Sequence, residues 1–259
     1  MKTIIAFANQ KGGLGKTACA VLTARTMMDD LKQRILFCDL DVQGNASFTL
    51  KNFKSCISIS DFLKRDLSEN EIESLKDKNL ALLSATEDLA NDEGFVIKDC
   101  LMHFNNNLNK IKDYYDYVII DTPPTLGNKL FLSLMITKKV VVPIEPESFA
   151  LQGLQKLIVT ISNLKEVNPE LDLIGIVINK LQSNRPRQKA NVEQIRQSYL
   201  KDNLFKTILK YRDCISDALS NGISLSELRK THGYSSRTFT AARNEFRSLT
   251  DEIIARCKQ

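Results

Sequence analysis

The chain has 259 residues, of which 43% are apolar and 26% are charged, and its formal net charge is +5. This composition excludes an intrinsically disordered chain and supplies the core of a single α/β domain over residues 1–259. No apolar run approaches the roughly 20 residues that a membrane helix needs, and the first residues form no signal-peptide pattern, so we expect a globular, cytoplasmic protein without membrane contact.

Cysteine spacing and charge distribution narrow the class of protein further. The six cysteines are scattered without a C-x-x-C pair, which favours reduced core residues over a zinc site or a disulfide framework. Residues 182–259 carry 15 Lys and Arg against 8 Asp and Glu, whereas residues 1–181 carry 21 against 23. The basic final third is typical of a surface that binds a polyanion, although an ordinary solvated surface is the alternative.

A strand, a glycine-rich loop and a helix are predicted at the start of the chain. The apolar residues 4–8 precede N-Q-K-G-G-L-G-K-T at residues 9–17, and residues 18–32 carry apolar side chains at helical spacing. Gly12, Gly13 and Gly15 can adopt backbone angles closed to other residues, so successive N–H groups can form an anion-binding nest.

The same loop carries a positive charge and a metal ligand. The helix N-terminus adds its dipole, the Lys16 ammonium can reach the β- and γ-phosphates of a polyphosphate, and the Thr17 hydroxyl is placed to ligate Mg²⁺. A glycine turn that binds nothing is the alternative. The candidate binding residues of the loop are Lys11, Gly12, Gly13, Leu14, Gly15, Lys16, Thr17 and Ala18.

Two acidic residues follow the next predicted strand. The apolar residues 35–38 run into Asp39, and D-L-D-V-Q-G-N continues over residues 39–45. Carboxylates at the carboxyl end of a parallel strand face the crevice where nucleotides bind in open α/β sheets, so Asp39 and Asp41 are expected near the metal and the γ-phosphate. A purely structural role, as caps of a helix near Ala46, is the alternative.

Residues 51–113 are less informative. They predict a helix near Ser58–Arg65, a strand at Leu80–Ser84 and a helix around Glu93–Ile111. His103 lies within that last helix without a partner at ligand spacing, so we interpret it as structural.

A third acidic site follows an apolar strand that begins at Tyr115. The strand ends in Asp121, which can hold Mg²⁺ through a water molecule, and D-T-P-P-T-L-G continues over residues 121–127. Two prolines stop further strand pairing there. A buried strand that ends in Asp by chance is the alternative.

The rest of the chain predicts two more core strands and a closing helix. Residues 140–154 predict a strand, a loop and the start of a helix that runs over Ser148–Val167, and Leu173–Lys180 predict a strand with Asn179 near its end. Basic residues then gather around one helix and the last strand. Thr238–Arg256 is predicted as the final helix, with its apolar side turned inward through Phe239, Ala242, Phe246, Leu249 and Ile253.

The loop motif resembles a known family. K-G-G-x-G-K-T at residues 11–17 is similar to the deviant Walker A motif of the ParA/MinD group of ATPases, with Gln10 where the standard pattern has glycine and with the additional Lys11. D-L-D-V-Q-G-N resembles that family's D-x-D-P-Q-G-N, with Val42 in place of proline. D-T-P-P-T-L resembles its D-x-P-P-S-L switch, and residues 140–154 resemble its V-x-x-P-x-x-P-E-x-x-A-L-x-G segment.

This resemblance implies a ParA-type partition ATPase with a doubly wound, mostly parallel sheet and helices on both faces. It implies hydrolysis of ATP with Mg²⁺, in which Lys16 binds phosphate, Asp41 orients the attacking water, and Thr17 and Asp121 serve the metal. ATP would close a homodimer in which Lys11 of each subunit reaches the partner's phosphates, and the helix over residues 148–167 would line part of the dimer face. Asn179 would lie near adenine, or is a simple turn residue.

The resemblance also implies partners for the basic region. Nonspecific duplex DNA fits better than single strands, because few aromatic residues are interleaved. A ParB-like centromere-binding protein would stimulate a hydrolysis that is slow without it, and the protein would associate with the nucleoid. The candidate DNA contacts are Arg185, Arg187, Lys189, Lys210, Arg212, Arg237 and Arg243.

Three other functions share this loop chemistry. A MinD-like ATPase would act on a membrane surface through a basic amphipathic final helix, whereas this chain ends in D-E-I-I-A-R-C-K-Q with only two apolar isoleucines. An iron–sulfur reductase component would need cysteines that bridge a cluster, and nothing here has that context. A scaffold that binds nucleotide without hydrolysis is disfavoured by the presence of Lys16, Thr17, Asp41 and Asp121.

Overall fold

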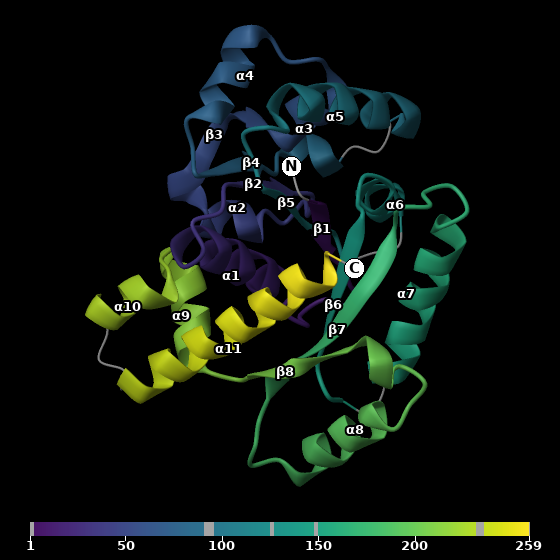
Figure 1. The fold of residues 1–259 in the computed structure, drawn as a ribbon, viewed down its shortest axis with the longest axis vertical. Helices are drawn as coiled ribbons and strands as arrows, with labels where there is room; N and C mark the ends of the chain where they lie inside the picture. Colours follow the sequence, from purple (N-terminus) through teal and green to yellow (C-terminus); the bar gives the residue numbers. More distant parts are fainter. Residues whose placement is uncertain (1–2, 91–95, 125–126, 148–149, 232–235, 259) are drawn as a thin grey trace.

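The computed structural model describes residues 3–90, 96–124, 127–147, 150–231 and 236–258. Its centre is an eight-stranded parallel sheet with the order β3-β4-β2-β5-β1-β6-β7-β8 (Figure 1). The strands are β1 (Thr3–Phe7), β2 (Ile35–Asp39), β3 (Lys54–Ser58), β4 (Leu80–Ser84), β5 (Tyr117–Asp121), β6 (Lys139–Ile144), β7 (Asp172–Leu181) and β8 (Leu204–Lys210). The predicted fold class is confirmed, and the sheet is parallel throughout these strands.

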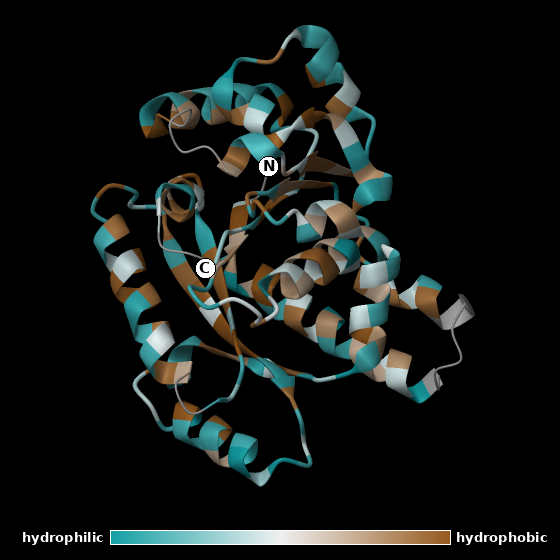
Figure 2. Ribbon diagram, turned by 180° about the vertical axis from the view of Figure 1, so that it is seen from behind, coloured by the Kyte–Doolittle hydropathy of each residue, from teal (hydrophilic) through white to brown (hydrophobic). Residues whose placement is uncertain are grey.

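Helices cover both faces because side chains alternate along the buried strands. In β1, Ile5 and Phe7 pack into one core cluster, whereas Ile4 and Ala6 pack into another on the opposite face. The first face carries α1 (Lys16–Asp29), α2 (Asn45–Thr49), α9 (Asp213–Asn221), α10 (Leu225–Thr231) and α11 (Ser236–Arg256). The second carries α3 (Ile59–Lys64), α4 (Glu69–Lys76), α5 (Ile97–Ile111), α6 (Asn128–Met135), α7 (Ala150–Leu164) and α8 (Pro186–Arg196). Figure 2 shows hydrophobic and hydrophilic residues mixed along these helices, as one-sided burial requires.

The final helix, α11, packs on β8, which is an edge strand of the sheet. Helix α11 packs along α1 and across β8 (Figure 1). The Glu252 carboxylate accepts hydrogen bonds from the backbone N–H groups of Lys206 and Thr207, each at 2.8 Å, and Glu245 accepts one from the Lys210 N–H at 3.1 Å. The side chains predicted to face inward are all buried, namely Phe239, Ala242, Phe246, Leu249 and Ile253.

Several element boundaries differ from the sequence-based predictions. Helix α1 ends at Asp29 rather than at residue 32, and Lys32 has a positive φ of 57°. Ser58 is the N-cap of α3 rather than its first residue. Residues 91–95 and 148–149, where two helices were expected to begin, lie outside the described residues, and α7 ends at Leu164 rather than at Val167. Strand β3 and helices α4, α6, α9 and α10 were not predicted.

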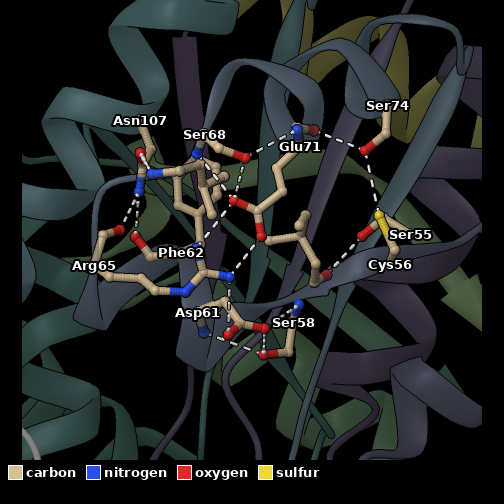
Figure 3. Close-up of polar contacts among 12 residues, drawn as sticks. Ser55, Cys56, Ser58, Asp61, Phe62, Arg65, Ser68, Glu71, Ser74 and Asn107 are labelled. Carbon is tan, nitrogen blue, oxygen red and sulfur yellow. Dashed lines mark hydrogen bonds and ion pairs between the residues drawn. The ribbon is translucent and has the colours of Figure 1, made fainter.

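A polar network fixes the corner between α3 and α4 (Figure 3). Each helix begins with a capping box, formed by Ser58 with Asp61 in α3 and by Ser68 with Glu71 in α4. The Arg65 guanidinium joins the two boxes, because it donates to Glu71 Oε1 at 2.6 Å and to Asp61 Oδ1 at 3.4 Å. These bonds lower the pKa of Glu71 to about 2, chiefly through Arg65.

Asn107 of α5 supports this corner from inside the protein. Its side chain is fully buried, accepts a hydrogen bond from the Leu67 N–H at 2.8 Å, and donates to the carbonyl oxygens of Phe62 at 3.0 Å and Arg65 at 2.8 Å (Figure 3). One amide therefore satisfies three backbone groups that the α3–α4 connection leaves without partners.

We predict that Asn107→Ala lowers the free energy of unfolding by about 3 kcal/mol, because it leaves buried backbone groups unsatisfied. Urea unfolding of the two proteins measures the difference. Asn106→Ala is the matched control, since its exposed side chain donates hydrogen bonds to the exposed Asp66, and it should change stability by less than about 0.5 kcal/mol. Equal effects of the two variants would contradict the role given to Asn107.

Candidate functional site

The glycine-rich loop between β1 and α1 takes its shape from two glycines. Gly13 and Gly15 have φ values of 81° and 82°, in the left-handed region that other residues avoid. At Gly15 a side chain is also excluded sterically, because a Cβ atom there would collide with the Asn179 side-chain amide. The loop conformation therefore depends on glycine at these positions.

The first residues of α1 are arranged to receive an anion. Gly15 is the N-cap without a side-chain cap, and the first turn of the helix contains no acidic residue. Its N–H groups are therefore left without an acceptor from the usual capping side chains. Lys16 is buried at 6% exposure, while Leu14, Thr17 and Ala18 are half-buried.

Hydrogen bonds to the neighbouring strands β6 and β7 hold the loop in place. Asn9 donates from Nδ2 to the Pro143 carbonyl oxygen at 2.7 Å, and its Oδ1 accepts the Lys11 N–H at 3.0 Å. At the end of β7, Asn179 donates from Nδ2 to the Leu14 carbonyl oxygen at 2.9 Å. The sequence did not single out Asn9 as an anchor, and no spacing rule identifies one.

The Asp39 carboxylate accepts hydrogen bonds from its own loop and from α2. It accepts hydrogen bonds from the Ser47 N–H and hydroxyl, both at 2.7 Å, and from the Asp41 N–H at 3.2 Å. Burial raises its pKa from an ordinary 3.8 to about 6, and the bonds from Ser47 oppose that shift. Asp39 thus binds the first turn of α2, as the capping alternative predicts for it.

Asp41 differs from Asp39 because it faces the cavity. The residue is 5% exposed, and its carboxylate accepts a hydrogen bond from the Gln43 N–H at 3.0 Å. It lines the same cavity as the glycine loop. A buried carboxylate with acceptor positions still open, at the carboxyl end of a central strand, can orient a water molecule.

Asp121 is fully buried, and within the described part of the chain neither of its carboxylate oxygens has a partner in good hydrogen-bond geometry, although the Thr17 hydroxyl lies close enough to lower its pKa. It pairs in register with Asp39 across β2 and β5. Burial and, next, the charge of Asp39 raise its pKa from 3.8 to about 8, while the Lys16 ammonium and the nearby Thr17 hydroxyl lower it. An unpartnered buried carboxylate beside a hydroxyl fits a cation site, because Mg²⁺ binds one or two carboxylates together with water and phosphate oxygens.

A cavity of about 680 Å³ opens beside the glycine loop and Asp41. Its size is that of typical small-molecule sites. It is lined by Gly12, Gly13, Gly15, Lys16, Thr17, Ala18, Asp41, Gln43, Asn45, Asn179 and Lys180 near the loop, and by Phe48, Thr49, Lys210, Tyr211, Arg212, Ile215, Leu219 and Phe246 farther away. Lys11 is exposed and is not among the lining residues.

The candidate DNA-contacting residues fall on separate elements. Arg185, Arg187 and Lys189 are exposed at the start of α8, at the foot of the molecule in Figure 1. Arg237 is exposed at the start of α11, and Lys210 is exposed at the end of β8.

Two candidates are already paired with acids. Arg212 binds both oxygens of Glu245, at 2.5 and 2.7 Å, and Arg243 contacts Asp30 at 2.6 Å. Sequence could not reveal these pairs, because their members lie 33 and 213 residues apart.

The described part of the chain contains no helix that is both long and apolar enough to cross a membrane.

The fold and the glycine loop define a P-loop nucleotide-binding protein of the α/β class. A family profile described as an AAA domain matches residues 2–173. The chain belongs to the ParA-type partition ATPase family, within the ParA/MinD group.

Named relatives cover nearly all of the chain. It is 32% identical over 263 residues to the protein IncC of Escherichia coli, an alignment that covers 99% of this chain and 70% of IncC. It is 31% identical over 228 residues to the sporulation initiation inhibitor protein Soj of Bacillus subtilis, covering 86% of this chain and 89% of Soj. The ATP complex of a McdA variant from Cyanothece has the same fold, with a TM-score of 0.72, 18% identity, and coverage of 97% of this chain and 96% of McdA.

We predict that the buried Asp121 makes stability depend on pH. Because its pKa is higher in the folded protein than in the unfolded chain, the folded state binds this proton more tightly, and its contribution to stability falls as pH rises from about 4 to about 8. The free energy of unfolding of Asp121→Asn, relative to that of the unmutated protein, should therefore rise by on the order of 2 kcal/mol between pH 5 and pH 8. Urea unfolding in EDTA without nucleotide measures this.

The exposed carboxylate of Asp77 provides the control for this measurement. Asp77→Asn should leave the difference in stability from the unmutated protein nearly constant between the two pH values. If Asp121→Asn behaved in the same way, the buried carboxylate would not be the titrating group.

Proposed function

We propose that this protein is a DNA partition ATPase in which Mg²⁺–ATP closes a homodimer that binds duplex DNA nonspecifically. The observation that carries the proposal is the different position of the two loop lysines, one buried and one exposed. Lys16 is buried in the cavity of its own chain, whereas Lys11 is exposed outside it. Such a lysine is available to the active site of a second subunit, where it would supply charge as an arginine finger does.

Within one subunit, each part of the phosphate site has a distinct role. The loop N–H groups and the Lys16 ammonium bind the β- and γ-phosphates, and Asp41 accepts a hydrogen bond from the attacking water and orients it. Thr17 and Asp121 would hold Mg²⁺, with Asp121 acting through a water molecule. The metal, when bound, neutralises charge on the phosphate oxygens.

ATP raises the affinity for DNA because it joins two subunits, and therefore two basic surfaces, in one dimer. A closed dimer presents residues 182–259 of two chains together, and a doubled number of phosphate contacts raises both the affinity for DNA and its salt dependence. Hydrolysis, slow until a ParB-like partner stimulates it, then releases the DNA. Through these surfaces the protein would associate with the nucleoid in the cytoplasm.

A MinD-like role on a membrane surface is the alternative, and the packing of α11 argues against it. Lipid binding needs an apolar helix face that is free to enter the bilayer surface. In α11 that face is buried against α1 and β8, with Phe246 at 2% and Leu249 and Ile253 at 0% exposure. ATP-dependent sedimentation with anionic liposomes, without retention on DNA, would favour the alternative.

We expect the protein to be retained on duplex DNA with ATP but not with ADP or without nucleotide, and retention should weaken steeply as salt rises. Filter binding or a DNA-coated sensor across salt concentrations measures this. Retention that is equal in all three nucleotide states would overturn the proposal of a nucleotide-controlled dimer.

Single substitutions separate the proposed roles. Lys16→Ala should weaken ATP binding by at least about 100-fold, because it removes the buried ammonium. Lys11→Ala should bind ATP normally yet stay monomeric in light scattering, whereas Lys112→Ala, an exposed lysine at the end of α5, should still dimerise.

Asp41→Ala should bind ATP and DNA but lower the hydrolysis rate about 100-fold, because the orienting carboxylate is lost. Phosphate release measures the rate, and gel filtration with ATP measures the dimer. Normal hydrolysis by this variant would show that another group orients the water.

A further inference from the structure

Two consecutive side chains at the end of β7 hold two consecutive carbonyl groups of the phosphate loop. Asn179 donates from Nδ2 to the Leu14 carbonyl oxygen at 2.9 Å, and the Lys180 ammonium donates to the Gly13 carbonyl oxygen. From the sequence, Asn179 was expected either near adenine or as a simple turn residue, and Lys180 had no expected role.

Peptide planarity turns these contacts into a constraint on the loop N–H groups. In a trans peptide the C=O and N–H bonds point in opposite directions. The bond from Lys180 to the Gly13 carbonyl therefore directs the Leu14 N–H away from Lys180, and the bond from Asn179 to the Leu14 carbonyl does the same for the Gly15 N–H. Successive N–H groups of this kind are the donors of an anion-binding nest.

This constraint matters because glycine does not choose a conformation by itself. Gly13 and Gly15 adopt φ values of 81° and 82°, but glycine populates other regions about as readily. Contacts from outside the loop are needed to select the conformation in which the donors converge.

Lys180 is held in position at a conformational cost. Its φ of 54° lies in the left-handed region, which is unfavourable for a residue with a side chain. Its ammonium also forms an ion pair with Glu145 Oε1 at 2.7 Å, just after β6. Strained backbone that persists beside a binding site indicates that the surrounding contacts require it.

We propose that Lys180 and Asn179 are positioning residues that orient the Leu14 and Gly15 N–H groups toward the phosphates, and that Glu145 fixes Lys180 for this purpose. This inference rests on the proposed function, since the oriented donors serve a bound polyphosphate. It also gives Asn179 a role in phosphate binding that does not require contact with adenine.

Inorganic tripolyphosphate separates loop positioning from base recognition, because it has phosphates and no base. Lys180→Ala and Asn179→Ala should each weaken binding of ATP and of tripolyphosphate by the same factor, about tenfold. Isothermal titration measures both ligands, with Lys112→Ala as the unaffected control. If Asn179→Ala weakened only ATP, Asn179 would read adenine, and its positioning role would be excluded.

Lys180→Gly and Lys180→Arg distinguish positioning from general stability. The glycine variant relieves the unfavourable φ, so it should melt at a higher temperature than Lys180→Ala and yet bind ATP equally weakly. Lys180→Arg should recover most of the affinity, and Glu145→Gln should lose less than Lys180→Ala. Affinity that followed melting temperature across the series would overturn the inference.

Backbone amide NMR tests the inference without nucleotide. In ¹⁵N-labelled protein the Leu14 and Gly15 amide signals should shift in Lys180→Ala and not in Lys112→Ala. Unchanged signals in Lys180→Ala would refute the positioning role of Lys180. Failure of the unmutated protein to bind ATP would instead refute the proposed function, so the two failures are distinguishable.

Discussion

Three carboxylates, Asp39, Asp41 and Asp121, lie at the carboxyl ends of two adjacent parallel strands, and one buried ammonium, that of Lys16, opposes their charge. Parallel pairing imposes this proximity, because it brings the ends of β1, β2 and β5 to one edge of the sheet. The pKa of Asp121 is raised because burial, first, and the neighbouring acids outweigh Lys16 and Thr17. A divalent cation would relieve it, so the fold itself creates the demand that Mg²⁺ can meet.

Residues of the C-terminal third lie both at the cavity and at the edge of the sheet. Arg212 lines the cavity and binds Glu245 of α11 through both carboxylate oxygens. Carboxylates of the same helix accept hydrogen bonds from backbone N–H groups of β8. The helix also carries Arg237 and Arg243. One helix thus lines the cavity, contacts the edge strand and carries two of the candidate DNA contacts, so in the proposed function it would link the nucleotide site to the DNA surface.

The site was predictable from sequence where its chemistry is local, and not where it depends on contacts across the fold. The glycine loop, Asp41 and Asp121 follow buried strands directly, so residue order alone places them at one edge of the sheet. Ser47, Asn9 and Glu145 carry no such signal, because their partners come from other strands.

The same distinction explains which elements of the fold were found. The strands next to the centre of the sheet are continuous apolar runs, as β5 illustrates. Strand β3 was missed because its buried side consists of Ser55 and Ile57, which gives too little apolar alternation to recognise. The α3–α4 corner depends on the hydrogen bond from the Leu67 N–H to Asn107. Its two residues lie 40 positions apart, so no local sequence pattern predicts it.

The carboxylates that α11 places along β8 have a consequence for assembly. An edge strand normally offers its free N–H groups to any extended segment, which invites runaway pairing between molecules. Here Glu245 and Glu252 already occupy those donors at three positions. These three bonds leave fewer N–H donors on this edge of the sheet for pairing with another copy of the chain.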